Sequence, residues 1–137
     1  FLLLDLDHFK EINDTLGHAQ GDVILERFAD LVRKNIRSID IACRYGGDEV
    51  VIIFSFTNME GALEVASRLR KRIEDCNFGT GDAPQHFTAS IGLLSAEGKD
   101  GADVDVFLQA LDQRLYEAKN TGRNKICFAH FKDVRSA

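Results

Sequence analysis

Two adjacent glycines, Gly46 and Gly47, lie between two runs of strand-forming residues, and this arrangement constrains the fold more than any other feature of the chain. Residues 41–45 lead into the glycine pair and residues 50–54 lead out of it. Glycine adopts positive φ without steric cost, and a Gly-Gly pair between such runs is typical of a tight turn. The sequence therefore predicts a β-hairpin with its turn at the glycine pair.

Carboxylates follow two of the apolar runs. Asp48 and Glu49 come directly after the glycine pair, at the tip of the predicted hairpin. Asp5 and Asp7 follow the apolar residues 1–4. Oxygen ligands of this kind suit a hard cation that serves phosphate chemistry. The alternative is that aspartate and glycine form only an ordinary solvated turn.

The composition limits the class of protein. The chain has 137 residues, of which 45% are hydrophobic, enough for one globular domain with a substantial core. A formal net charge of −5 argues against a polymeric nucleic acid as partner. No apolar run approaches the ~20 residues that cross a bilayer, so we expect no membrane segment within this chain. The three cysteines form no CxxC pair, which favours reduced thiols and a cytoplasmic location.

The spacing of apolar residues predicts alternating strands and helices. Expected strands cover 1–4, 41–45, 50–56, 87–94 and 125–131, expected helices cover 8–16, 22–37, 59–75 and 103–120, and expected loops cover 79–86 and 95–100. This order is βαββαβ followed by an added αβ unit, which predicts an α/β (α+β) fold with a ferredoxin-like or palm-like core. We expect about five strands in a mostly antiparallel sheet flanked by helices. The first hairpin strand would lie beside the first strand of the chain and bring Asp5 close to Asp48.

Four segments of the chain resemble the signatures of one known family. Residues 5–22 begin with Asp-Leu-Asp-His-Phe-Lys, residues 44–49 are Arg-Tyr-Gly-Gly-Asp-Glu, residues 90–92 are Ser-Ile-Gly, and residues 115–124 end in Gly-Arg-Asn. In this order they resemble GGDEF domains, the diguanylate cyclases that condense two GTP into cyclic di-GMP and release two pyrophosphates. The resemblance implies a single GGDEF domain over residues 1–137, without the segment that precedes the first strand in the family. Val50 replaces the phenylalanine of the motif, and we expect it to pack in the core beside the turn.

The resemblance implies a metal site at the two acidic segments. Asp5, the backbone carbonyl of Leu6 and Asp48 would supply oxygen ligands for Mg²⁺, with Mn²⁺ as the alternative. Either Asp48 or Glu49 can take the proton from the attacking 3′-hydroxyl, and the sequence does not separate a ligand from a base. Asp7 lies on the other face of an extended strand from Asp5, so we expect it to have a structural role.

Three basic residues match positions that contact the triphosphate in the family. Lys10 begins the first predicted helix and can reach the β- and γ-phosphates, where it would act in catalysis; the alternative is a solvated surface lysine. Lys119 and Arg123 are four residues apart at the end of the last predicted helix. Their alternative role is a favourable interaction with the helix C-terminus.

The guanine base presents two donors beside one acceptor. Asp22 can accept from the donors and Asn13 offers both polarities, which favours GTP over ATP. The alternative for Asp22 is a helix N-cap, a role that one side chain can combine with base contact. His18 matches a weaker nucleotide contact, or is a loop histidine with local hydrogen bonds. The remaining GTP-binding positions implied by the resemblance are Phe9, Gly46 and Gly47.

An RxxD motif precedes the hairpin. Arg37 and Asp40 match, in spacing, the inhibitory site at which such cyclases bind their own product, cyclic di-GMP. A guanidinium forms paired hydrogen bonds with phosphate or guanine acceptors, and an aspartate accepts from guanine. Arg68, on the next predicted helix, is an accessory candidate. The alternative is a surface ion pair at the end of a helix.

These observations lead to one main interpretation of function and two alternatives. The main one is an active diguanylate cyclase domain in a larger sensor protein, working as a dimer because the product is built from two GTP. One alternative is a GGDEF-like module that binds GTP or cyclic di-GMP and regulates a partner with weak turnover or none. The other is a palm-like nucleotidyl cyclase for a different substrate, because a fold alone does not set the substrate. Asn13 together with Asp22 weighs against it.

Overall fold

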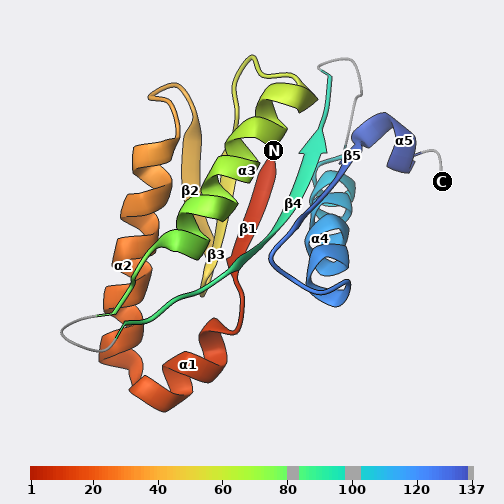
Figure 1. Ribbon diagram of the computed structural model, residues 1–137. Helices are drawn as coiled ribbons and strands as arrows, with labels where there is room; N and C mark the ends of the chain where they lie inside the picture. The colour runs from red at the N-terminus through yellow and green to blue at the C-terminus, as the bar shows by residue number, and fades with distance from the viewer. Residues whose placement is uncertain (80–83, 98–102, 136–137) are drawn as a thin grey trace.

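The computed structural model describes residues 1–79, 84–97 and 103–135. It contains one five-stranded sheet in the order β2-β3-β1-β4-β5, with helices packed on both faces (Figure 1). Neighbouring strands are antiparallel except for the parallel pair β4 and β5. The mixed α+β fold and the mostly antiparallel sheet are therefore confirmed. Of the expected loops, residues 80–83 and 98–100 lie outside the described part of the chain.

The elements follow one another in the expected βαββαβ-αβ order with one addition. They are β1 (Leu2–Leu6), α1 (Phe9–Leu16), α2 (His18–Asn35), β2 (Ile41–Gly46), β3 (Glu49–Ile53), α3 (Met59–Asp75), β4 (Ala89–Ser95), α4 (Val104–Asn120), β5 (Ile126–His130) and α5 (Phe131–Arg135). The helices expected at 8–16 and 22–37 are α1 and α2, and a short α5 that was not expected follows β5. The buried Phe131 anchors α5 against the α4 side of the core.

The central strand β1 separates two hydrophobic clusters. All five of its residues are buried, as expected for a strand covered on both faces. Leu2, Leu4 and Leu6 pack in the cluster beneath α2 and α3. Leu3 packs in the second cluster with residues of α4 and α5. Since alternate residues of a strand point to opposite faces, β1 fixes both layers of helices and ends at the acidic segment.

The order of strands corrects one prediction. β3, the second hairpin strand, lies beside β1, whereas β2 forms the edge of the sheet. Asp5 is therefore opposite Glu49 in the register, with Leu4 opposite Val50. Burial explains the choice: the middle residues of β3 are buried and apolar, while β2 is exposed over most of its length. The more apolar strand takes the interior position because that position removes both of its faces from water.

The hairpin turn also differs from its prediction. Neither Gly46 nor Gly47 adopts positive φ. Instead the register shifts between Arg44 and Gly46, which marks an irregularity before the turn. Arg44 Nε donates to the Gly47 carbonyl at 2.9 Å and closes the turn. A Cβ at Gly47 would meet no atom within 4 Å, so the space above this glycine is open.

A tight corner joins α1 to α2. Gly17, at φ 85°, lies between the two helices, and α2 begins at His18. Asp22 is therefore inside α2, and its predicted N-cap role is wrong. Gly21 lies under α1, where a Cβ would come within 1.9 Å of Asn13 Oδ1. Any larger residue at this position would displace the Asn13 side chain, which lies next to the start of α2.

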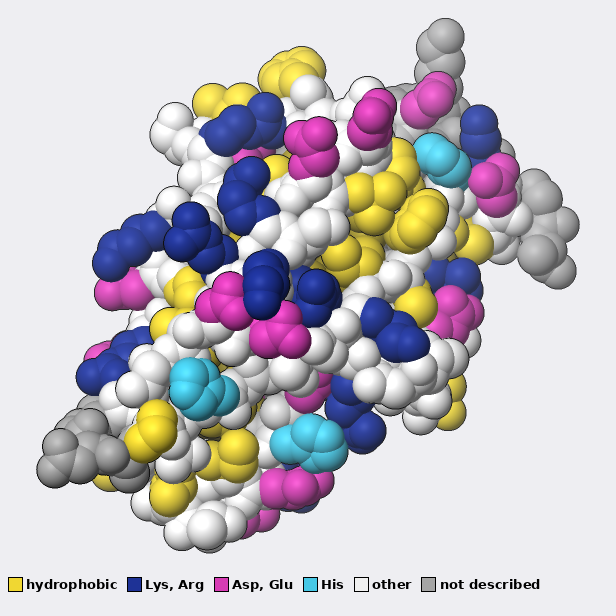
Figure 2. Space-filling view, viewed as in Figure 1, with side chains coloured by type: hydrophobic (Ala, Val, Ile, Leu, Met, Phe, Trp, Pro, Cys, Tyr) yellow, Lys and Arg dark blue, Asp and Glu magenta, His cyan; other side chains and the backbone are white. Residues whose placement is uncertain are grey.

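The charges are distributed unevenly despite the net acidity. Figure 2 shows Lys and Arg side chains gathered on the face of α2 and α3. The exposed members from these helices include Arg33, Lys34, Lys71 and Arg72. No helix in the described part of the chain is long and apolar enough to cross a membrane.

Candidate functional site

Asp5, at the end of β1, is an almost fully buried carboxylate. Its exposed fraction is 7%, and Lys119 Nζ donates to its Oδ2 at 2.7 Å. Burial raises the pKa of Asp5 to about 6, against the effect of the Lys119 hydrogen bond, and the charges of Asp48 and Glu49 raise it further. A buried acid with a raised pKa and like-charged neighbours is typical of a functional site.

The hairpin turn brings two more carboxylates to the same end of the sheet. Glu49 begins β3 opposite Asp5, and Asp48 precedes it in the turn. Burial raises the pKa of Asp48, while Lys119 and Arg44 oppose the shift. Asp5 and Asp48, from two segments, therefore both interact with the ammonium of Lys119. The expected convergence of Asp5 and Asp48 occurs, although through β3 rather than β2.

The chemistry of these donors fits a hard divalent cation. Oxygen ligands and surplus negative charge are what Mg²⁺ requires, and a cation would offset the repulsion that raises the pKa of Asp5. Among the described residues, no three or more His, Cys, Asp or Glu side chains form a closed metal site. A cation here would take its remaining ligands from backbone oxygens, water and phosphate, as Mg²⁺ commonly does.

Asp7 has the structural role that its position predicted. It is buried, and its carboxylate accepts from Thr88 Oγ1 at 2.6 Å and from Ser90 Oγ at 2.7 Å. The backbone N–H of Asn124 donates to it at 3.1 Å. Asp7 therefore ties the end of β1 to β4 and to the loop after α4, close to the acidic site.

The α1–α2 corner brings together the residues expected to contact the base. Asn13 Nδ2 lies 3.0 Å from His18 Nδ1, and Asp22 is exposed one turn further along α2. Phe9 is buried and faces Phe87, with their ring centroids 6.5 Å apart, so its contribution is to the core. Lys10 is exposed on α1.

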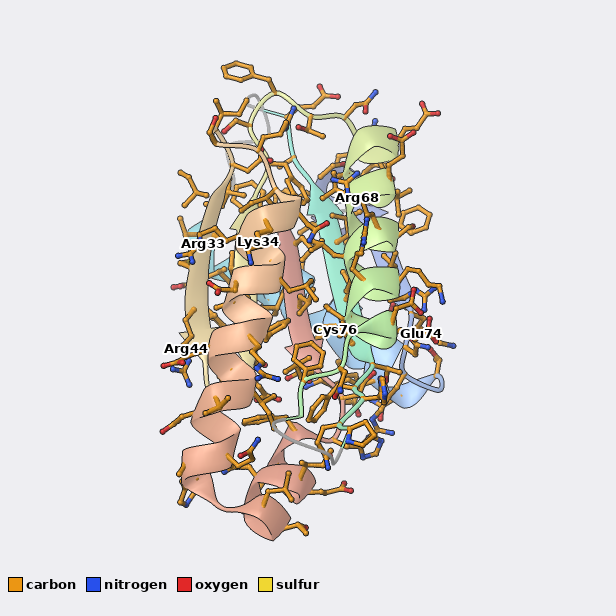
Figure 3. The ribbon with its side chains drawn as sticks, turned by 60° about the vertical axis from the view of Figure 1, so that its left-hand side comes forward. Arg33, Lys34, Arg44, Arg68, Glu74 and Cys76 are labelled. Carbon is orange, nitrogen blue, oxygen red and sulfur yellow. The ribbon has the colours of Figure 1, made fainter. Side chains whose placement is uncertain are left out.

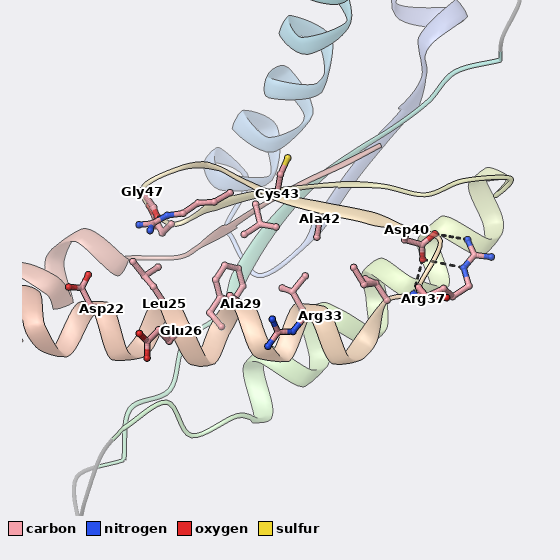
Figure 4. A pocket seen from close by; sticks show the side chains of 17 residues that line it. Asp22, Leu25, Glu26, Ala29, Arg33, Arg37, Asp40, Ala42, Cys43 and Gly47 are labelled. Carbon is pink, nitrogen blue, oxygen red and sulfur yellow. Dashed lines mark hydrogen bonds and ion pairs between the residues drawn. The ribbon is translucent and has the colours of Figure 1, made fainter.

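A groove of about 910 Å³ runs between α2 and the hairpin. Asp22, Gly47 and Asp48 line one end, and Arg37 and Asp40 line the other (Figure 4). Its lining also includes the apolar side chains Leu25, Phe28, Ala29, Val32, Ala42 and Val50. No motif in the sequence predicted this groove. The signal was the pair of small residues on facing elements, Ala29 and Ala42, which leave space where larger side chains would fill it.

The far end of the groove holds a closed ion pair. Asp40 accepts from the backbone N–H of Arg37 at 2.9 Å, from its Nη2 at 2.9 Å and from its Nε at 3.2 Å. The Asp40 side chain is 1% exposed and that of Arg37 is 51% exposed. Burial alone would raise the pKa of Asp40, but the hydrogen bonds from Arg37 outweigh it and hold the pKa below its usual value.

Arg37 has further partners, and Arg68, the accessory candidate, lies near them. Arg37 Nη2 also donates to the Ser55 carbonyl at 3.2 Å and to Thr57 Oγ1 at 2.6 Å. Arg68 of α3, labelled in Figure 3, donates to the Asn35 carbonyl at 3.0 Å, at the end of α2. Arg37, in the segment after α2, and Arg68, on α3, therefore both lie near the C-terminal end of α2.

Comparison with known proteins agrees with this geometry. A family model described as diguanylate cyclase, GGDEF domain, matches residues 1–125. The chain is 40% identical over 126 residues to the response regulator PleD of Caulobacter vibrioides, covering 91% of this chain and 28% of that protein. It is 38% identical over 125 residues to diguanylate cyclase A of Treponema denticola, covering 91% of this chain and 33% of that protein. The chain thus spans a third or less of these curated relatives.

Solved structures give the same result. The GGDEF domain of DgcB from Caulobacter crescentus, in complex with c-di-GMP, superimposes with a TM-score of 0.83 at 28% identity, covering 93% of this chain and 75% of that one. Diguanylate cyclase SiaD of Pseudomonas aeruginosa, in complex with its activator SiaC, gives a TM-score of 0.85 at 32% identity, covering 93% of this chain and 48% of that one. The family model, the curated relatives and the fold agree, and the chain belongs to the GGDEF domain family of diguanylate cyclases.

Proposed function

We propose that residues 1–137 form one active diguanylate cyclase domain, which condenses two GTP into cyclic di-GMP with release of two pyrophosphates. One observation carries the proposal: Asp5, Asp48 and Glu49 meet at the end of a groove whose same end contains Asp22. A charged phosphate site thus adjoins a space that has a hydrogen-bond acceptor for guanine. Structures of relatives with c-di-GMP support the product.

The residues divide into roles along the nucleotide. Asp5, Asp48 and the Leu6 carbonyl would hold Mg²⁺ or Mn²⁺, which neutralises the triphosphate and the charge that develops on it. Glu49 or Asp48 takes the proton from the attacking 3′-hydroxyl as its oxygen bonds to the α-phosphate and pyrophosphate departs. Lys10 and Arg123 bind the phosphates. Lys119, paired with Asp5, keeps that carboxylate ionised and balances charge beside the metal.

The reaction requires a second copy of the domain. One groove accommodates one GTP, whereas each product molecule contains two guanosine monophosphate units. Two domains facing each other would each present an α-phosphate to the 3′-hydroxyl held by the other. The rate should therefore rise faster than linearly with protein concentration until the dimer is saturated.

A direct assay tests the activity. Purified protein with GTP and Mg²⁺ should yield cyclic di-GMP and pyrophosphate in a 1:2 ratio, separated by chromatography, and ATP should yield no cyclic dinucleotide. Removal of the metal with EDTA should stop turnover. GTP binding without any product, at concentrations where the protein is dimeric, would contradict the proposal and favour a regulatory binding module.

Guanine selectivity should depend on Asp22. Asp22→Asn changes one of the two acceptor oxygens into a donor. The affinity for GTP should therefore fall about tenfold, which is the cost of an unpaired polar group at the base. Glu26→Gln, one turn further along the same helix and lining the same groove, is the matched control and should bind GTP like the parent. Equal losses in both variants would show a general charge effect instead of base recognition.

The ion pair at the other end of the groove is the proposed product-inhibition site. Arg37 and Asp40 would bind cyclic di-GMP, with Arg68 as an accessory contact. Arg37→Ala should abolish tight product binding and leave the initial rate nearly intact, so progress curves lose their early plateau. Lys34→Ala, which removes a neighbouring exposed charge, is the control. Unchanged product affinity in Arg37→Ala would reduce the motif to a structural ion pair.

A further inference from the structure

The loop after α4 has an unusual backbone. Gly122, Arg123 and Asn124 all have positive φ, at 114°, 55° and 48°. Non-glycine residues rarely adopt this region, and two in succession persist only where the surrounding structure holds them. Asparagine tolerates the left-handed conformation better than most residues, but arginine has no such preference. A specific set of contacts must therefore hold this loop.

The side chain of Asn124 supplies those contacts. Its Oδ1 accepts from Arg70 Nη1 at 2.8 Å, and its Nδ2 donates to Glu74 Oε1 at 2.9 Å. Arg70 and Glu74 are one turn apart on α3, with Arg70 Nη1 3.5 Å from Glu74 Oε2, and together they hydrogen-bond both polar atoms of the amide. The backbone N–H of Asn124 is fixed separately, by Asp7. Glu74 lies well along α3 from Arg68, as Figure 3 shows.

Arg123, the preceding residue, has a fixed backbone but a side chain without hydrogen-bond partners among the described residues. The backbone of Arg123 is fixed, since its N–H donates to the Ala118 carbonyl at 3.0 Å and its neighbour is gripped by α3. Its side chain, however, is exposed and makes no hydrogen bond or ion pair with any other described residue. A fixed backbone with an uncommitted guanidinium is the arrangement that lowers the ordering cost of binding an anion.

We infer that Asn124, gripped by Arg70 and Glu74 of α3, is a positioning residue that sets Arg123 for the triphosphate of GTP. The inference rests on the proposed phosphate role of Arg123 and adds two residues of α3 that touch neither the groove nor the acidic site. It explains why an arginine occupies a left-handed position. It also makes α3, which carries Arg68 near the inhibitory ion pair, a direct support of the phosphate site.

The test uses Asn124→Gly, because glycine keeps the left-handed backbone and the N–H to Asp7 while removing both side-chain hydrogen bonds. GTP affinity should fall about tenfold, as expected for two hydrogen bonds of ordinary strength. Affinity for GMP, whose base contacts lie at the α1–α2 corner, should change less than twofold. In steady state, KM should rise while kcat changes little. A merely structural role would not separate GTP from GMP.

A double-mutant cycle tests whether Asn124 acts through Arg70 and Glu74. In an Arg70→Ala/Glu74→Ala background, Asn124→Gly should have almost no further effect, since the partners of its side chain are already gone. Glu64→Gln, on the exposed side of α3, is the control and should match the parent. Thermal unfolding of every variant confirms that the proteins are folded at the assay temperature.

Each contrary result has a distinct meaning. If Arg123→Ala binds GTP like the parent, the proposed phosphate role is wrong, and the inference fails with it. If Arg123→Ala loses affinity but Asn124→Gly does not, only the positioning role is overturned. Equal losses for GTP and GMP, or a full tenfold loss in the background without Arg70 and Glu74, would also overturn it.

Discussion

The two ends of the groove are both acidic, but their charges are balanced in opposite ways. At the hairpin turn, Asp5 shares the ammonium of Lys119 with Asp48, and burial raises the pKa of Asp5 to about 6. At the other end, Arg37 matches Asp40 with three hydrogen bonds, and the pKa of Asp40 is lowered. The fold therefore leaves charge uncompensated at one end and compensates it fully at the other.

This contrast separates two kinds of ligand binding. The turn end gains by accepting a cation, because the cation relieves repulsion that folding created. The Arg37 end has nothing to relieve, and an anionic ligand there must compete with Asp40, Ser55 and Thr57 for the guanidinium. In the proposed function, the resting structure thus favours the metal ion, whereas product would have to displace the internal contacts of Arg37. Such an order suits a site that responds only after product has accumulated.

The largest effect should come from removing one of the uncompensated charges. Asp48→Asn keeps the size of the side chain but weakens the metal site, and turnover should fall by about a thousandfold. Pyrophosphate release at saturating GTP and Mg²⁺ measures it. Asp112→Asn, an exposed change on α4, is the control. Parental turnover in Asp48→Asn would show that the turn end is not the metal site.

Removing the compensated carboxylate should instead damage stability. Asp40→Ala removes the carboxylate that accepts three hydrogen bonds from Arg37 and leaves its backbone N–H without that acceptor, so it should lower the free energy of unfolding by about 2 kcal/mol. Asp30→Ala is the matched control, because Asp30 pairs with Arg33 at the same spacing but on the exposed surface. It should cost below about 0.5 kcal/mol in urea unfolding. Equal costs would mean that burial does not distinguish the two ion pairs.

The pH dependence of stability should have opposite slopes at the two ends. The pKa of Asp5 is raised on folding, so the folded state binds its proton more tightly, and its contribution to stability is present below about pH 4 and lost as pH rises through about 6. Without metal, the free energy of unfolding of the parent protein should fall by about 1–2 kcal/mol relative to Asp5→Asn between pH 4 and 7.

Asp40 has a lowered pKa, so its contribution to stability is present above its unfolded pKa and is lost as pH falls below 3.8. Urea unfolding in EDTA, across this pH range, measures both. A constant difference between Asp5→Asn and parent would contradict the raised pKa.

The smallest effect should come from removing one of the internal acceptors that bind the Arg37 guanidinium. Thr57→Val removes the hydroxyl that accepts from Arg37 Nη2, so cyclic di-GMP should bind about two- to threefold more tightly. Isothermal titration with the product measures this. Thr15→Val, whose hydroxyl bonds only within α1, is the control. Weaker or unchanged binding would mean that the internal contacts support the site rather than compete with ligand.

The local sequence predicted where helices and strands lie along the chain more reliably than it predicted which strands lie side by side. The helix predicted for residues 59–75 is α3 with the same bounds, and the apolar run at the start of the chain is the fully buried β1. The start of α2 was placed four residues too late because Asp22 is a good N-cap type, and the Gly17 corner outweighed that preference. The short α5 was missed, since one buried Phe131 does not create a helical period.

The sequence by itself determined the family, the acidic residues at the turn, the RxxD motif and the apolar faces, because these depend on residue type and spacing along the chain. Tertiary structure alone decided that β3 instead of β2 meets β1, that Lys119 pairs with Asp5 across 114 positions, and that α3 grips Asn124. The physical reason is that burial and charge compensation depend on contacts between distant segments. Strand order follows from which faces leave water, and an ion pair forms only where folding brings both partners together.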